Sequence, residues 1–381
     1  MVLVFVSKEQ RPGETRVAAT PETVKQLVKA GAETSVEAGA GLAASYSDAE
    51  YEQAGAKVVT DGPAARSSAD LVLAIHPPAP AEVSGLKAGS TLVCSLQPLL
   101  ALPLVQALAE AKVTSFAMDL MPRITRAQKM DILSSQATVA GYQAVLMSAA
   151  ALPKMFPLLM TAAGTLTPAK VVVLGAGVAG LQAIATARRL GAVVEANDIR
   201  PAVAEQVESL GASFIDTGTP PQAETSGGYA KETSEEYARK QKETLTQHLS
   251  AADVVITTAL IPGRKAPILV DEDMVKAMSQ GSVIVDLAVE MGGNVEGSVA
   301  GETVTKHGVT IIGESNLPGH CARDASQMFG RNVGAFLELI LKEGALAPDW
   351  EDECVVGTCV THDGDVKHAA SVEALGAKGA S

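Results

Sequence analysis

The chain alternates short runs of aliphatic residues with longer segments in which apolar positions recur every three or four residues. The short runs, rich in β-branched residues, predict buried strands, and the longer segments predict amphipathic helices. The strand-like runs are VLVFVS, TSVEAG, AKVVT, ADLVLAI, STLVCSL, VTSFAM, AKVVVLG, AVVEAND, ASFID, DVVITTAL, SVIVDLA and VTIIGE. Strands that alternate with helices in this way are typical of an α/β fold with a mainly parallel sheet.

The predicted helices also suggest where the chain divides. They cover residues 21–31, 103–112, 132–152, 178–191, 202–211, 237–251, 271–281 and 323–342. Asp271 is the predicted N-cap of the helix that it opens. A length of 381 residues favours two domains. We predict that the helix at 132–152 leads into the second domain and that the helix at 323–342 returns to the first. The tail at 368–381 is predicted to be frayed.

The predicted fold is therefore α/β, with two domains that each contain a mainly parallel sheet and a cleft between them. The first domain comprises residues 1–135 and 325–381. The second comprises residues 136–324.

Composition narrows the possible functions. The formal charge is −13 and there is no basic run, which argues against a nucleic-acid partner. No stretch approaches the roughly 18 apolar residues of a membrane span, and the N-terminus lacks the basic region of a signal peptide. We therefore expect a soluble, cytoplasmic chain. Its cysteines form no C-x-x-C pair and have no histidine at ligand spacing, so free thiols are expected and no metal site is predicted. They are Cys94, Cys321, Cys354 and Cys359.

A dinucleotide fingerprint follows the strand-like run AKVVVLG. Gly175, Gly177 and Gly180 have the G-x-G-x-x-G spacing and open a predicted helix. The first glycine allows a tight turn, the second lets a pyrophosphate approach the backbone, and the third lets the helix pack closely on the strand. Asp198 ends the next strand, 198 − 175 = 23 residues on, where an acid accepts hydrogen bonds from an adenosine ribose. This pattern predicts that residues 136–324 form a Rossmann dinucleotide-binding domain. It also predicts NAD(H) rather than NADP(H), although Arg200 nearby weakens the preference.

A second glycine cluster is a weaker candidate. Gly39, Gly41 and Ala44 have similar spacing, and Asp61 follows 22 residues after the first glycine. The preceding strand is short and polar, however, and the first helix-capping signal comes later, at Ser47. We therefore predict that these glycines open a loop, not a second dinucleotide site.

The segment MPRITRAQKMDILSSQ, residues 121–136, places many hydrogen-bonding side chains between two apolar runs. Folding alone gives no obvious reason for them. They could bind a ligand, or they could form a polar hinge between the domains.

Several of these segments resemble one family. RPGETRVAATPE, MPRITRAQKMDILSSQATVAGY, TAAGTLTPAKVVVLGAGVAGLQAIATARRLGA, SGGYAKE, TTALIPGRKAP and SVIVDLAVEMGGN span nearly the whole chain. They resemble the NAD(H)-binding component, domain I or the first portion of the alpha subunit, of proton-translocating NAD(P) transhydrogenase. Alanine dehydrogenase shares the two-domain plan and is the alternative.

The resemblance implies a division of labour among subunits. This chain would hold NAD(H), a separate subunit would hold NADP(H), and a membrane-embedded subunit would carry the proton path. It also implies a homodimer that lies at the inner face of the cell membrane through its partners. Hydride would pass directly between two nicotinamides with Re/Si specificity, only when the partners are present. This reaction releases no proton at the reacting carbons, so it needs alignment in a dry pocket and no acid or base.

The resemblance also implies roles for individual residues. In the 121–136 segment, Arg123 and Asp131 would form a polar pair, Ser134 would hydrogen-bond the nicotinamide carboxamide, and Gln128 would lie between the two rings. Tyr229 and Gly228 would belong to a mobile loop that closes over the cofactor. The full set of implied cofactor-binding residues is Gly175, Gly177, Val178, Ala179, Gly180, Asp198, Ile199, Arg200, Gly228, Tyr229, Thr258, Ala259 and Leu260.

The alternative, alanine dehydrogenase, would require particular side chains at the substrate, and the sequence can be compared with that requirement. Amino-acid dehydrogenation moves protons as well as hydride, and so needs ionisable groups at the substrate. Where alanine dehydrogenases have a lysine and a histidine, this chain has His76 and Gln97, although Arg16 matches their carboxylate-binding arginine. These changes favour transhydrogenation. A dehydrogenase that uses His76 and a non-catalytic NAD-sensing module remain the competing hypotheses.

Overall fold

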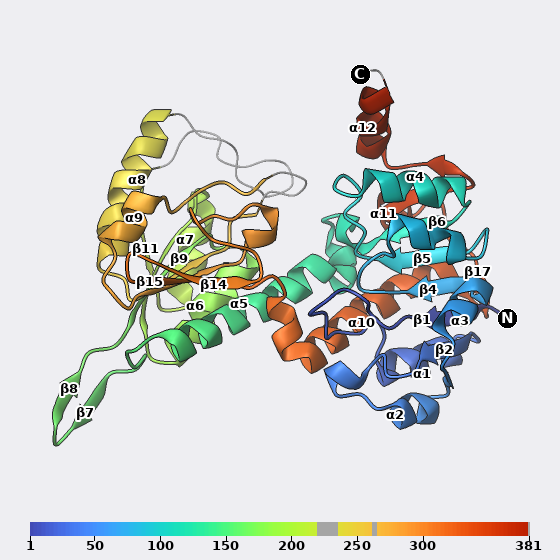
Figure 1. The fold of residues 1–381 in the computed structure, drawn as a ribbon, viewed down its shortest axis with the longest axis horizontal. Helices are drawn as coiled ribbons and strands as arrows, with labels where there is room; N and C mark the ends of the chain where they lie inside the picture. Colours follow the sequence, from blue (N-terminus) through green and yellow to red (C-terminus); the bar gives the residue numbers. More distant parts are fainter. Residues whose placement is uncertain (219–234, 261–264, 380–381) are drawn as a thin grey trace. The chain divides into compact units, whose positions relative to one another are not determined.

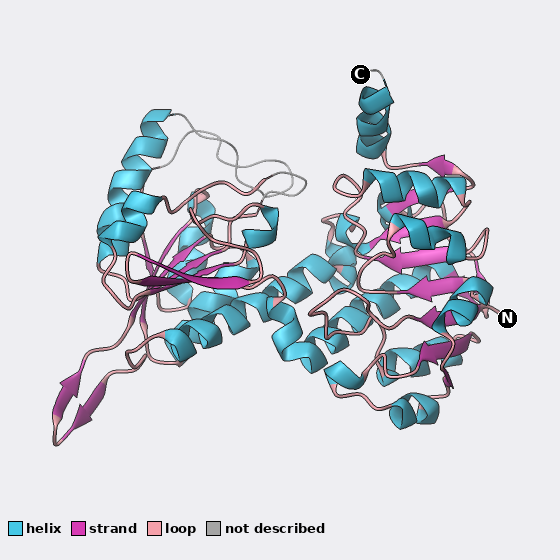
Figure 2. Ribbon diagram, viewed as in Figure 1, coloured by secondary structure: helices cyan, strands magenta, loops and turns pink. Residues whose placement is uncertain are grey.

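The computed structural model describes residues 1–218, 235–260 and 265–379. The chain forms two compact units: unit 1 contains Met1–Gln136 and Gly319–Ser381, and unit 2 contains Ala137–Pro318. Each is an α/β unit with a mainly parallel sheet, as the pattern of apolar runs predicts (Figures 1 and 2).

The sheet of unit 1 has the strand order β19-β18-β6-β5-β4-β1-β2-β3. The six strands from β6 to β3 run parallel, and β18 and β19 add antiparallel strands at one edge. The strands are β1 (Leu3–Val6), β2 (Glu33–Glu37), β3 (Lys57–Val59), β4 (Leu71–Leu73), β5 (Thr91–Cys94), β6 (Thr114–Ala117), β18 (Cys359–His362) and β19 (Asp365–Val366).

Helices cover both faces of this sheet because alternate residues of its central strand enter different cores. Val4 and Val6 join the core that contains Phe329 and Phe336 of α10, whereas Phe5 joins the core of α4. The α-helices of unit 1 are α1 (Pro21–Lys29), α2 (Asp48–Gln53), α3 (Gly62–Ser68), α4 (Leu102–Glu110), α10 (Ala322–Ile340), α11 (Glu353–Thr358) and α12 (Ala369–Gly379). Helix α5 (Ile132–Ala151) begins in unit 1 and continues into unit 2.

The sheet of unit 2 has the order β11-β10-β9-β12-β13-β15-β14. All of these strands are parallel except β14, which pairs antiparallel with β15 at the edge. The strands are β9 (Lys170–Leu174), β10 (Val193–Asn197), β11 (Ser213–Phe214), β12 (Val254–Thr257), β13 (Val283–Asp286), β14 (Glu302–Lys306) and β15 (Val309–Gly313).

Two helical layers cover the sheet of unit 2. Val171 and Val173 of β9 pack in one core with α6, whereas Val172 and Leu174 pack in the other with α8 and α9. The helices are α6 (Val178–Arg189), α7 (Ala204–Ser209), α8 (Glu235–Ser250) and α9 (Glu272–Ala277). The predicted N-cap of α9 is confirmed, since the Asp271 carboxylate accepts the amide of Met274 at 3.0 Å.

The sequence patterns missed several short elements. Strands β7 (Leu159–Thr161) and β8 (Gly164–Leu166) form a hairpin that projects from the rest of unit 2 (Figure 1), and β16 (Leu341–Lys342) pairs with β17 (Ala345–Leu346). Runs of two or three residues are too short to show a period of two.

The prediction of a frayed tail was wrong, because residues 369–379 form helix α12. Its Ser371 is fully buried, so tertiary packing holds a segment whose sequence is rich in small residues. Among the described residues, none of the helices is long and apolar enough to cross a membrane.

Candidate functional site

The link between β9 and α6 is the tight glycine turn that the fingerprint predicts. Gly175 has a φ of +102°, a conformation that favours glycine. An added Cβ at Gly180 would lie 1.8 Å from the carbonyl oxygen of Gly175, so the helix can approach the strand only without a side chain there. The Thr258 hydroxyl donates to that same carbonyl at 3.0 Å and holds the turn against the end of β12.

Gly177 differs from the other two glycines. An added Cβ there would meet no heavy atom of the described residues within 4 Å. Gly177 is also the N-cap of α6, and within the described part of the chain no side chain caps the first amides of this helix. Uncapped amides and the positive end of the helix dipole favour an anion at this place. The turn thus combines free space with unsatisfied donors, which is what a pyrophosphate requires.

Asp198 follows β10 directly and faces the glycine turn. Its carboxylate accepts the amide of Ala176 at 2.7 Å and a pair of side-chain hydrogen bonds from Arg200, each at 2.9 Å. Burial would raise the pKa of the Asp198 carboxyl, but the hydrogen bonds from Arg200 and Ala176 outweigh it and hold the pKa below its ordinary value. The acid is therefore ionised at neutral pH and able to accept hydrogen bonds.

The segment after β12 supplies a second strand end at the same edge of the sheet. Ala259 is held from both sides by Asn294, whose Oδ1 accepts the Ala259 amide at 3.0 Å and whose Nδ2 donates to the Ala259 carbonyl at 2.9 Å. Asp286, which is fully buried, accepts the amides of Asn294 and Val295 and so fixes the loop that carries Asn294. Sequence reasoning missed Asn294; the Gly-Gly-Asn run was its only signal.

The polar segment 121–136 becomes a turn of 3-10 helix, η4 (Thr125–Met130), followed by the start of α5. Asp131 caps α5, since its carboxylate accepts the amide of Ser134 at 3.0 Å and the Ser134 hydroxyl at 2.5 Å. The side chains of Arg123 and Gln128 are exposed. Folding therefore accounts for Asp131, but it does not account for Gln128.

Other predicted residues are less constrained by the structure. Val178 and Leu260 are exposed, whereas Ala179 and Ile199 are half-buried. Gly228 and Tyr229 lie outside the described residues, so their proposed role in covering the cofactor stays a prediction.

The weaker glycine cluster has a structural explanation. The three residues after Gly41 form a short 3-10 turn, and helix α2 begins only after Ser47, whose side chain caps it. Asp61 accepts the amide of Ala64 at 3.0 Å and caps α3. The prediction that these glycines open a loop is confirmed.

Comparison with known proteins places this geometry in a family. Residues 5–140 match the family model "Alanine dehydrogenase/PNT, N-terminal domain", and residues 144–369 match "Alanine dehydrogenase/PNT, C-terminal domain". The chain belongs to the alanine dehydrogenase/PNT family. Within it, the chain is 51% identical to the first portion of the NAD(P) transhydrogenase alpha subunit of Rhodospirillum rubrum, over 96% of this chain and 98% of that protein.

Both branches of the alanine dehydrogenase/PNT family are represented among its relatives. The crystal structure of transhydrogenase from Sinorhizobium meliloti matches with a TM-score of 0.87 and 49% identity, over 96% of this chain and 99% of that one. The alanine dehydrogenase of Bacillus subtilis is 30% identical over 98% of this chain and 95% of that protein. The chain is thus a homologue of the transhydrogenase alpha subunit and a more distant relative of alanine dehydrogenase.

His76 and Arg16, which were compared above with alanine dehydrogenase residues, lie beyond the carboxyl ends of strands in unit 1. His76 follows β4, and its Nε2 lies 2.8 Å from Oε2 of Glu14. Arg16 donates to both oxygens of Glu14, at 2.9 and 2.7 Å, and to Gln136 at 2.8 Å. Burial would raise the pKa of the Glu14 carboxyl, but Arg16 and His76 hold it well below its ordinary value. Sequence reasoning had missed Glu14, the acid that joins Arg16 to His76.

Half-buried carboxyl groups also accept hydrogen bonds from the backbone amides at these strand ends. Glu9 accepts the amides of Ile75 and His76, at 2.6 and 3.3 Å, and Asp119 accepts those of Leu96 and Gln97, at 2.6 and 3.0 Å. Burial raises the pKa of both carboxyl groups, although the amides partly offset it. These amides, unlike those that open α6, already have acceptors.

Proposed function

We propose that the chain is the NAD(H)-binding component of a proton-translocating transhydrogenase, with direct hydride transfer between NADH and NADP⁺ held on a partner subunit. The observation that carries the proposal is the combination at α6 of uncapped amides, the open space at Gly177 and the ionised Asp198. The bound NADH supplies the hydride, and the residues of this chain bind and orient it.

We assign the binding roles as follows. The amides of Gly177, Val178 and Ala179 bind the pyrophosphate, and Asp198 accepts hydrogen bonds from the adenosine ribose. Gly175 and Gly180 shape the turn. Ile199, Arg200, Thr258, Ala259 and Leu260 line the rest of the binding surface, and Gly228 and Tyr229 cover it.

The 121–136 segment contacts the nicotinamide in this proposal. The Ser134 hydroxyl donates to Asp131, and in this proposal the same hydroxyl hydrogen-bonds the nicotinamide carboxamide. Arg123 forms a polar pair with Asp131. Gln128 lies between the two nicotinamide rings and reaches the nucleotide on the partner subunit. The reaction needs positioning of two rings, so these groups act by alignment and none of them moves a proton.

Reconstitution tests the proposal directly. We expect hydride exchange between NADH and an NADP⁺ analogue only when an NADP(H)-binding subunit is added to this chain. Gln128→Asn should slow the exchange about tenfold and leave the NADH dissociation constant within about twofold. Oxidative deamination of L-alanine by the chain alone would instead support an amino-acid dehydrogenase. Tight NADH binding without exchange in any reconstitution would support a sensing module.

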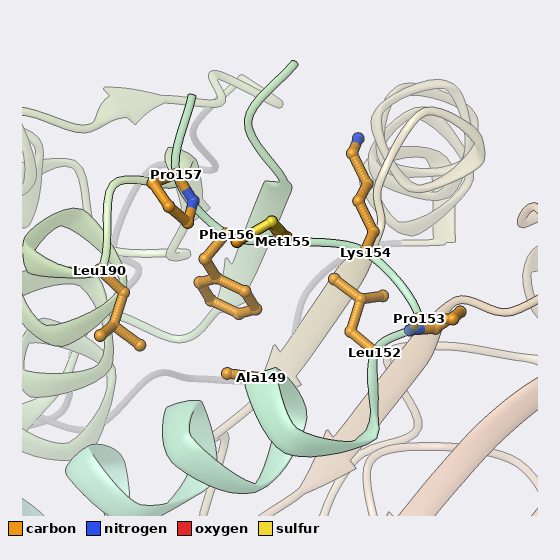
Figure 3. Close-up of a pocket in the computed structure, with 8 residues that line it drawn as sticks. All are labelled: Ala149, Leu152, Pro153, Lys154, Met155, Phe156, Pro157 and Leu190. Carbon is orange, nitrogen blue, oxygen red and sulfur yellow. The ribbon is translucent and has the colours of Figure 1, made fainter. Parts of the chain in front are cut away.

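We also propose that the chain forms a homodimer through the β7–β8 hairpin. Two strands alone are marginally stable in water, yet this hairpin exposes Leu158, Met160 (77% exposed) and Leu166. At its base, Phe156 and Leu190 help to line an apolar hollow of about 550 Å³ (Figure 3). A second copy would cover these surfaces. Light scattering of the isolated chain tests this, and a monomer mass at micromolar concentration would contradict it.

The proposal includes two partner subunits of the transhydrogenase. An NADP(H)-binding subunit receives the hydride, and a membrane-embedded subunit couples the transfer to proton translocation. The chain is then peripheral to the inner face of the cell membrane. Fractionation of native membranes should recover it with those subunits, and its release by mild salt would distinguish docking from insertion.

A further inference from the structure

The 3-10 turn η4 has one buried face and one exposed face. Ala127 and Met130, three residues apart and therefore on the same side of a 3-10 turn, are each 1% exposed and join the core that includes α10. Gln128 lies on the exposed side. Apolar contacts are not directional, so these two side chains hold the turn in place without fully setting its rotation.

A buried hydrogen bond restrains the rotation of the turn η4. Asn332 of α10 is 8% exposed, and its Nδ2 donates to the carbonyl oxygen of Lys129 at 2.8 Å. Lys129 is the residue directly after Gln128. The bond therefore fixes the backbone beside Gln128 relative to a long helix of the same unit.

The amide of Asn332 is not explained by stability alone. Its Oδ1 is buried and has no hydrogen-bond partner among the described residues. Leaving a buried acceptor unsatisfied costs at least as much free energy as the net gain from the bond that Nδ2 makes. A leucine of similar size would avoid that cost. An asparagine at this place is thus better suited to orientation than to stabilisation.

Two ion pairs also tie the turn to the rest of unit 1. Lys129 pairs with Glu338 at 3.1 Å, and because both side chains are exposed this pair is weak and is screened by salt. Arg126 forms a bidentate pair with Asp352, at 2.7 and 2.8 Å. That pair holds the end of the arginine side chain, whereas the buried bond from Asn332 holds the backbone next to Gln128.

We propose that Asn332 is a positioning residue for hydride transfer, which acts by holding the carbonyl of Lys129 and thereby setting the direction of Gln128. This inference rests on the proposed function, because it assigns to Asn332 the alignment of a side chain that contacts the nicotinamide. Asn332 touches neither substrate nor cofactor in this role.

The test is a double-mutant cycle in the reconstituted exchange assay. Asn332→Leu should lower kcat about tenfold, since small misplacements of a reacting group are costly, while the NADH dissociation constant stays within about twofold. If Asn332 acts through Gln128, the variant with both Asn332→Leu and Gln128→Asn should be no slower than the slower single variant. Glu338→Gln, which removes the exposed partner of Lys129, is the matched control and should leave kcat within about twofold.

Two results would overturn the inference. One is an Asn332→Leu variant with the kcat of the parent. The other is a cycle in which the two losses of kcat multiply, since independent effects are additive in free energy. Should Asn332→Leu fail to fold, Asn332→Ala removes the same donor and takes its place. An unsubstituted chain without exchange activity would instead mark failure of the proposed function itself.

Discussion

The two units share a strand order but differ at the edge where α/β sheets bind ligands. In unit 1 the six parallel strands run in the order β3-β2-β1-β4-β5-β6, and in unit 2 the matching order is β11-β10-β9-β12-β13-β15. This is the doubly wound order, in which the crevice lies where the chain reverses direction across the sheet. Even the antiparallel additions fall at the same edge, beyond the sixth strand.

The difference lies in the link that follows the first strand. In unit 2, three residues separate Leu174 from Val178, so the uncapped helix faces the strand end directly. In unit 1, the link runs from Val6 to Pro21, carries buried charges and ends in a helix capped by Thr20. Topology thus provides a crevice in both units. The segment between the first strand and the first helix decides whether an anion can bind there.

The largest expected effect is a loss of stability at the carboxyl edge of the sheet in unit 1. Glu14→Gln should lower the free energy of unfolding at pH 7 by about 3–5 kcal/mol, because Glu14 is 1% exposed and its loss leaves Arg16, 9% exposed, with an uncompensated buried charge. Urea unfolding of the parent and the variant measures this. NADH affinity of the folded variant should stay within about twofold, since Glu14 is not among the residues that we propose to contact the cofactor.

The same variant has a pH signature. The folded-state pKa of Glu14 lies below its unfolded value of 4.5, so the stabilisation is complete above that pH and is lost as pH falls toward the folded pKa. The gap in stability between parent and Glu14→Gln should therefore narrow below about pH 4.5. A gap that is constant from pH 7 to pH 4 would contradict the assigned ionisation.

A smaller loss of stability is expected from Gly180→Ala in unit 2. The added Cβ would meet the carbonyl oxygen of Gly175, which cannot move without opening the turn. We expect a cost of about 3 kcal/mol and a loss of NADH binding that accompanies it. Thermal unfolding monitored by circular dichroism measures the stability, and stability equal to the parent would show that the helix can shift at no cost.

Gly177→Ala should separate binding from stability at the same turn. The backbone there, with φ of −77°, suits alanine, and the added Cβ meets nothing among the described residues. We expect unfolding within about 0.5 kcal/mol of the parent but NADH affinity lower by about tenfold, or about 1.4 kcal/mol. Titration by NADH fluorescence gives the affinity. Unchanged binding would mean that the pyrophosphate does not approach Gly177.

The smallest effect concerns the weaker glycine cluster in unit 1. Asp61→Ala removes the cap of α3 and should cost about 1 kcal/mol, with no change in NADH affinity. Asp198→Ala, the corresponding change in unit 2, is the matched comparison and should weaken NADH binding. If Asp61→Ala weakens binding as much, the loop after β2 takes part in cofactor binding after all.

Much of the fold and of the candidate site could be predicted because the signals are local. Strands such as β9 and β12 are continuous aliphatic runs, helix caps such as Asp271 stand at the helix start, and the glycine turn is complete within six residues. Each of these depends on residues that are neighbours in sequence, so spacing alone reports it.

The tertiary structure decided what spacing cannot encode. Glu14 meets His76 across 62 positions, and Asn332 meets Lys129 across 203, because strand order and helix packing bring distant segments together. Composition likewise gave no reason for α12 to be ordered or for the β7–β8 hairpin to project. The sequence by itself thus determined the longer strands and helices and the glycine turn after β9. Only packing decided which charges neutralise one another in unit 1 and which side chains of the 121–136 segment are buried or exposed.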